Sequence, residues 1–134
     1  MALLIGIVLA LAIALFGTLV GFDRERSFYS TVLAVIGGLY GLFAVMSGST
    51  STLLLEGIGI VAFLTLSVLG FKTSQWFLVA GLAAHGVYDY FRGHLFANSG
   101  VPAFWPMFCG SYDVTAAAYL AWLLRRRGAP KAST

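Results

Sequence analysis

Residues 2–21 read ALLIGIVLALAIALFGTLVG, and this uncharged stretch decides the class of the protein. A helix needs roughly 20 mostly apolar residues to cross about 30 Å of hydrocarbon, and the stretch has that length. It lacks the basic start and the small-residue cleavage site of a signal peptide. We therefore expect a transmembrane helix that is retained in the mature protein.

Four further apolar runs follow, at about residues 30–46, 53–69, 75–91 and 111–124. The chain is 60% hydrophobic and 10% charged, whereas about a quarter of the residues in a soluble domain are charged. The five runs use nearly all of the 134 residues. The sequence predicts an all-α integral membrane bundle of five transmembrane helices, forming a single domain over residues 1–134.

The segment between the last two runs, residues 94–110, has mixed signals. Pro102, Pro106 and the Asn98-Ser-Gly100 turn argue against a spanning helix, while Phe104 and Trp105 argue against a solvated loop. Aromatic side chains are favoured at the depth of the lipid headgroups. We therefore predict an interfacial loop between helices four and five.

The distribution of basic residues predicts the orientation. If the C-terminus is cytoplasmic and the chain spans five times, seven basic residues lie inside: Arg24, Arg26, Lys72, Arg125, Arg126, Arg127 and Lys131. Only Arg92 then lies outside, which is the bias of inner-membrane proteins. We expect a multi-pass bacterial inner-membrane protein with an extracytoplasmic N-terminus. Because no basic-aromatic surface accompanies the charge, no nucleic-acid partner is expected.

Two glycine pairs bear on the other partners. Gly17 and Gly21 are four residues apart, as are Gly37 and Gly41, and this spacing lets helix backbones approach closely in lipid. The expected partners are the lipid bilayer and a second copy of the chain, in a homo-oligomer packed through these faces.

Most polar residues that could carry chemistry fall in the second half of the chain. Under the predicted topology they converge on the extracytoplasmic side, and six are candidate ligand-binding residues: Glu56, His85, Asp89, Arg92, His94 and Asp113. His85 and Asp89 are four residues apart and share one helix face, which Arg92 continues. An ionisable residue inside a membrane span is a functional candidate by default.

A metal ion is one ligand that such residues suit. Imidazole nitrogen and carboxylate oxygen bind zinc, so His85, Asp89, Glu56 and His94 are the predicted ligands of a divalent metal such as zinc. Asp113 is expected to orient a ligand or act as a base. The signature motifs of zinc enzymes are absent, and HxxxD is not diagnostic. The single Cys109 excludes an internal disulfide and is interpreted as an apolar filler.

Each residue also has a structural interpretation. Glu56 and Asp113 fall in predicted first turns, where a carboxylate stabilises the helix dipole. His85 with Asp89 suits an interhelical packing pair, and Arg92 with His94 suits the headgroups. Three functions stay open: a protein that binds a small molecule, lipid or metal ion, a metal-dependent intramembrane hydrolase, and a structural or accessory subunit. Whether the protein is an enzyme is not decided by the sequence.

Two stretches carry a family resemblance. Gly21-Phe-Asp-Arg-Glu-Arg-Ser-Phe-Tyr-Ser-Thr-Val-Leu-Ala-Val-Ile36 is one. The other begins at His85-Gly-Val-Tyr-Asp89 and runs through Gly93-His94 and Asn98 to Cys109, and on to Tyr112-Asp113. Together they resemble a family of small bacterial integral membrane proteins of unknown function. The resemblance implies the membrane class and no activity.

Overall fold

The computed structural model describes residues 1–95 and 97–128. Within them the chain forms one 3-10 helix and five α-helices: α1 (Ala2–Val20), η1 (Phe22–Arg24), α2 (Ser27–Ser47), α3 (Thr50–Lys72), α4 (Trp76–Leu95) and α5 (Trp105–Gly128). The all-α class and the number of α-helices are confirmed for the described part of the chain.

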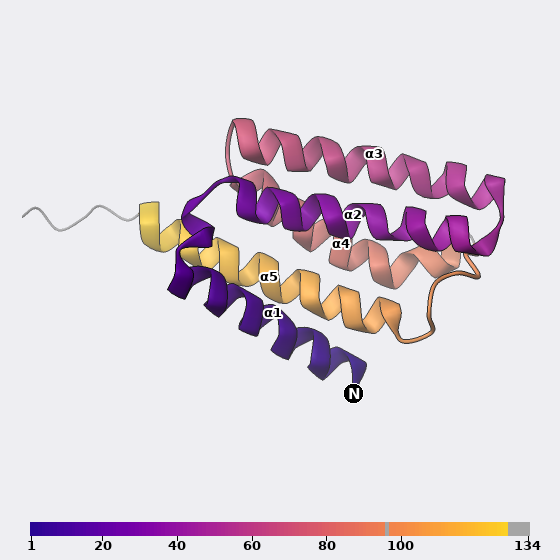
Figure 1. Ribbon diagram of the computed structural model, residues 1–134, viewed down its shortest axis with the longest axis horizontal. Helices are drawn as coiled ribbons and strands as arrows, with labels where there is room; N and C mark the ends of the chain where they lie inside the picture. Colours follow the sequence, from indigo (N-terminus) through magenta and orange to yellow (C-terminus); the bar gives the residue numbers. More distant parts are fainter. Residues whose placement is uncertain (96, 129–134) are drawn as a thin grey trace, which may run out of the picture.

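The five α-helices run alternately in opposite directions. α1 packs against α5, α5 against α4, and α2 against α3, while α4 also meets α2 and α3. Figure 1 shows the N-terminus, the α2–α3 turn and the α4–α5 connection at the right-hand end of the bundle. The α1–α2 and α3–α4 turns and the end of α5 lie at the left-hand end. We call these the N-terminal end and the C-terminal end of the bundle.

Three of the described helices, α1, α2 and α3, are long and apolar enough to cross a membrane by length and composition. α4 and α5 fall below that level of hydropathy because the buried stripe of each contains polar residues. In α4 the stripe runs from Leu78 and Leu82 to His85, Asp89 and Arg92, all of which are buried. The prediction of five spans is therefore supported by composition for three helices.

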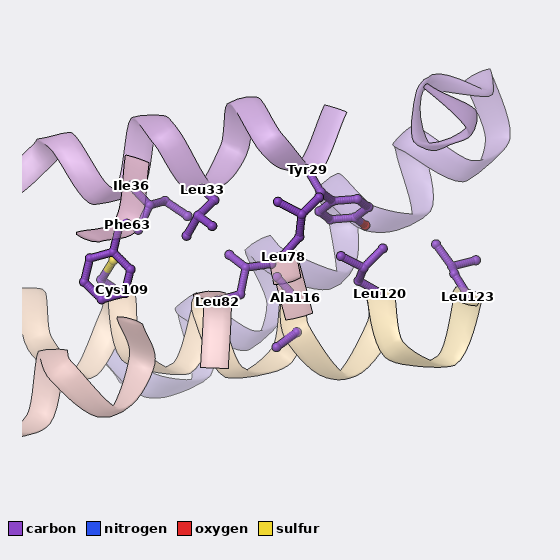
Figure 2. Packing of buried hydrophobic residues seen from close by; sticks show 11 residues of the cluster. Tyr29, Leu33, Ile36, Phe63, Leu78, Leu82, Cys109, Ala116, Leu120 and Leu123 are labelled. Atoms are coloured by element: carbon purple, nitrogen blue, oxygen red, sulfur yellow. The ribbon is translucent and has the colours of Figure 1, made fainter. Parts of the chain in front are cut away.

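An apolar core fills the bundle toward its C-terminal end. Leu33, Leu78, Leu82 and Leu120 are completely buried there. Figure 2 shows these leucines in a row that ends at Cys109 and Phe63. Lipid tails are as apolar as leucine, so in a membrane such a core is stabilised by close packing rather than by removal from water.

The region between α4 and α5 differs from its prediction. α5 begins at Trp105, six residues before the predicted Ser111, because Pro106 lies in the first turn, where no backbone N–H is needed. The connection is therefore shorter than predicted and occupies residues 97–104 of the described chain. α4 extends to Leu95, so Arg92 and His94 lie in its last turn.

The glycine pairs have different roles. A Cβ atom on Gly37 would lie 3.0 Å from Cβ of Phe63, and one on Gly41 would lie 2.7 Å from Cδ1 of Ile60. These two glycines therefore allow close contact between α2 and α3 within one chain. Gly21 instead ends α1 in the left-handed conformation, with φ of 97°.

Candidate metal centre

Four potential metal ligands meet where α4 packs against α5. His85 and Asp89 are one turn apart on α4, and Cys109 and Asp113 are one turn apart on α5. Each offers one ligand atom, and the four atoms lie within 4.8 Å of one another. All four residues are at most 3% exposed. We refer to them as the His–Cys–Asp group.

Two glycines bring the helices together at this level. A Cβ atom on Gly86 would lie 3.2 Å from the carbonyl oxygen of Gly110, and one on Gly110 would lie 3.4 Å from that of Gly86. Gly86 follows His85, and Gly110 follows Cys109. The close approach of the two backbones therefore sets the spacing of the ligand residues.

The His–Cys–Asp group is held by short internal contacts. Nδ1 of His85 lies 2.6 Å from Oδ2 of Asp113 and 3.5 Å from Oδ2 of Asp89. Sγ of Cys109 lies 3.7 Å from Oδ2 of Asp113. The two carboxylates thus share His85 as a basic partner, and they can bring more negative charge than one imidazolium neutralises.

Two atoms of the group lack a hydrogen bond. Among the described residues, Nε2 of His85 and Oδ2 of Asp89 are buried and have no hydrogen-bond partner. The 3.5 Å separation of Oδ2 from Nδ1 of His85 is an ion-pair distance and does not meet hydrogen-bond geometry. A buried polar atom without a partner costs about 1–3 kcal/mol, so each requires an explanation.

Three of the ligand-atom spacings can be compared with those of a tetrahedral transition-metal site. With bonds of about 2.0–2.3 Å, the ligand atoms of a tetrahedral zinc site lie roughly 3.3–3.8 Å apart. The His85–Asp89 and Cys109–Asp113 distances of 3.5 and 3.7 Å fall in this range. The His85–Asp113 distance of 2.6 Å is shorter. An ion would therefore replace the His85–Asp113 hydrogen bond and move these two residues apart by less than about 1 Å.

Tyr40 of α2 orients the α4 ligands. Its hydroxyl donates a hydrogen bond of 2.5 Å to Oδ1 of Asp89, the oxygen that does not face His85. Its ring stacks on the His85 imidazole at a centroid distance of 5.9 Å, and Phe63 packs edge-on at 4.6 Å. These contacts fix the His85 ring and leave Oδ2 of Asp89 for another ligand.

A second polar network lies nearer the end of α4. Oε1 of the buried Glu56 accepts hydrogen bonds from Tyr88 at 3.0 Å and from Nε of Arg92 at 3.4 Å. Its Oε2 accepts one from Asn98 at 3.2 Å. The Arg92 guanidinium also covers the Tyr40 ring at 4.5 Å. This Glu56 network ties α3 to α4 and to the connection that follows it.

The structure brings five of the six predicted residues to one region. His85, Asp89 and Asp113 belong to the His–Cys–Asp group, while Glu56 and Arg92 form an ion pair beside it. His94 is exposed in the last turn of α4 and is not part of the four-residue ligand group. Of the four predicted metal ligands, His85 and Asp89 are in the group, and Cys109 and Asp113 complete it in place of Glu56 and His94.

The early start of α5 explains the changed role of Asp113. Asp113 is the ninth residue of α5, about 12 Å along the axis from the first, so it cannot stabilise the helix dipole from the first turn. The same shift places Cys109 inside the helix, four residues before Asp113 and on the same face. Extending the predicted helix back over Pro106 would have revealed this pair. For Tyr40 and Asn98 the sequence carries no local signal.

A third buried polar cluster lies at the C-terminal end of the bundle. The Asp23 carboxylate accepts a hydrogen bond from Thr18 and one of 2.9 Å from Arg127. The Asp23 carbonyl accepts another from Arg127 at 2.9 Å, and Thr18 also contacts the Tyr119 hydroxyl at 2.8 Å. This Asp23 cluster fastens the turn after α1 to the end of α5.

Comparison with known proteins adds no assignment. No family model, curated protein or solved structure matches this chain. The chemistry of the His–Cys–Asp group is therefore argued from its geometry alone.

Proposed function

We propose that this protein is a multi-pass membrane protein that binds a divalent transition metal, with zinc as the best fit, in the His–Cys–Asp group. The observation that carries the proposal is the meeting of four buried ligand atoms within 4.8 Å of one another. The unpartnered Oδ2 of Asp89 lies among these residues, 3.5 Å from Nδ1 of His85. A cation between them would give that oxygen a partner and place a divalent positive charge beside both carboxylates. Buried charges of one sign require such a partner.

The types of donor atom select the metal. Magnesium and calcium favour sites built of oxygen atoms alone. A thiolate and an imidazole beside two carboxylates suit zinc and related transition metals better. Cys109 would bind as a thiolate, with its proton released to solvent when the metal enters.

A closed site favours metal binding over hydrolysis. Catalytic zinc usually has three protein ligands and an open position for water, whereas four protein ligands give a closed tetrahedral site. The His–Cys–Asp group offers four donors. An intramembrane hydrolase would have to release one of them to admit water.

The second candidate is a structural role, which two hydrogen bonds favour. The His85–Asp113 contact and the Tyr40–Asp89 hydrogen bond already join α2, α4 and α5. In that case the group holds helices together without an ion. Metal content separates the two functions, because a packing cluster needs no metal.

The proposal includes five spans. α4 and α5 contain 20 and 24 residues, about 30 and 36 Å of helix, and each is long enough to cross. The ionisable residues of the His–Cys–Asp group and the Glu56–Arg92 pair are buried inside the bundle, while Val87, Phe91, Val114 and Trp122 are exposed where lipid would lie. The basic ends of α3 and α5 favour a cytoplasmic C-terminal end in a bacterial inner membrane.

Metal analysis of the full chain, purified in detergent without chelator, tests the proposal. We expect about one zinc ion per chain and none in His85→Ala. His94→Ala is the matched control because His94 is exposed and lies outside the four-residue ligand group. It should retain the metal. A folded wild-type protein that takes up no transition metal, even after incubation with zinc, would leave the structural role as the better explanation.

A further inference from the structure

A groove lies between the start of α2 and the end of α3. Figure 1 shows these two helix ends at the C-terminal end of the bundle. Its volume is about 360 Å³. Ala34, Val68 and Phe71 supply apolar walls, and Lys72 stands at the end of α3. The groove is therefore lined by apolar side chains along both helices and has a basic residue at one end. We call the end at Lys72 the mouth of the groove.

Small polar residues form the groove where the two helices meet. Oγ of Ser30 donates to the carbonyl oxygen of Ser67 at 3.2 Å, and Oγ of Ser67 donates to that of Ser30 at 2.6 Å. These reciprocal bonds hold α2 and α3 together, while short side chains leave the space above them unfilled. Ser27 and Thr31 add exposed hydroxyl groups toward the mouth.

Positive charge is concentrated at the mouth. Nη1 of Arg26 donates to the carbonyl oxygens of Phe71 and Thr73, at 3.3 and 3.5 Å, which are the residues on either side of Lys72. The Arg26 guanidinium is thereby held beside the Lys72 backbone. α2 also begins here with no side chain capping it, and the positive end of its dipole favours an anion. Glu25 is the acidic residue near this mouth, and it lines the adjoining groove.

We infer that this groove binds one anionic phospholipid, with the phosphate at Arg26 and Lys72 and an acyl chain along Ala34, Val68 and Phe71. The inference rests on the proposed membrane insertion and is independent of the metal. Basic residues at the cytoplasmic surface attract anionic headgroups. The apolar walls distinguish a lipid from a free phosphate ion, which has no chain to place there.

Native mass spectrometry of the full chain in detergent tests the headgroup. We expect one phosphatidylglycerol to be retained in preference to phosphatidylcholine. Lys72→Glu should weaken that retention roughly tenfold, since charge reversal removes one attraction and adds a repulsion. Arg125→Glu is the matched control, because Arg125 is an exposed basic residue at the same end and does not line the groove. Equal weakening in both variants would mean diffuse surface attraction and overturn the inference.

A second pair of variants tests the acyl chain. Ala34→Phe fills the groove and should reduce lipid retention. Val35 is exposed and lies outside the groove, so Val35→Phe should not reduce it. Retention of inorganic phosphate with no retained lipid would show a site for a free phosphate ion and overturn the inference. Zinc content measured on the same samples should stay constant. A protein that failed to enter membranes would lose lipid retention in every variant alike.

Discussion

Asp23 and Asp89 are both buried aspartates, at opposite ends of the bundle, and their surroundings differ. Both carboxylate oxygens of Asp23 accept hydrogen bonds, one from Thr18 and one from the partly exposed Arg127. Asp89 has Tyr40 on one oxygen, and its other oxygen has no hydrogen bond among the described residues. Its neighbour Asp113 is a second acid, and the two share His85.

This difference distinguishes an ion pair that only joins helices from a group that can bind a cation. An aspartate that is paired with arginine and fully hydrogen-bonded is complete without a ligand, and Glu56 with Arg92 follows the same pattern. Two carboxylates around one imidazole, with a thiol beside them, are complete only when a cation is added or protons are shared. The number of buried acidic residues is therefore less informative than the charge of their partners.

The largest expected effect is on metal content. Asp113→Ala removes the central carboxylate, the one that contacts both His85 and Cys109. Zinc content, measured by elemental mass spectrometry, should fall from about one ion per chain to none. Chelator should then lower the unfolding temperature of the wild type but not of the variant, because a bound ligand stabilises only the state that binds it. If Asp113→Ala retains zinc, Asp113 is not a ligand, and its group no longer differs in role from the Asp23 ion pair.

The Glu56 network should respond in stability rather than in metal content. Glu56→Gln leaves the buried Arg92 without its carboxylate, and breaking such a pair costs about 3–5 kcal/mol. Unfolding in detergent should show this loss while zinc binding persists. Glu25→Gln is the control, since Glu25 is exposed and surface changes cost within about 0.5 kcal/mol. Loss of zinc in folded Glu56→Gln would restore Glu56 as a ligand.

The sequence predicted the helical class and most of the polar residues because both follow from local pattern. The apolar runs located the five α-helices of the described chain, and the i, i+4 spacing of His85 and Asp89 placed them on one face. The division into two networks could not be predicted, because it depends on which helices are neighbours. Cys109 was assigned to a loop because two prolines were read as helix breakers, although the first turn of a helix accepts proline. Tyr40 reaches Asp89 only through the packing of α2 on α4.

A substitution in the Asp23 cluster should lower stability and leave zinc content unchanged, the opposite of what is expected for Asp113→Ala. Asp23→Ala removes the partner of Thr18 and Arg127, and we expect a loss of about 2–3 kcal/mol in detergent unfolding. The loss is smaller than for Glu56 because Arg127 is partly exposed and can turn toward water. Zinc content should not change. A stability loss accompanied by release of zinc would show that the two ends of the bundle are coupled.

Tyr40→Phe should weaken zinc binding without removing a ligand. It removes the hydrogen bond that orients Asp89 and keeps the ring that stacks on His85. Loss of such a supporting contact typically costs 10–100-fold in metal affinity, about 1.4–2.7 kcal/mol. A competition titration with a zinc indicator measures the change. Tyr88→Phe, which removes a hydroxyl bonded to Glu56 instead, should leave zinc affinity within a few-fold of the wild type.

In the proposed metal site, the contact between Gly86 and Gly110 would discriminate ions by radius. Because these residues lack side chains, the two backbones rest on each other and fix how far His85 and Asp89 stand from Cys109 and Asp113. A larger ion such as calcium, with six to eight ligands at about 2.3–2.6 Å, would have to push the helices apart against their neighbours. The glycine pair would thus limit the size of the ion that fits, and a methyl group added at either position would change that limit.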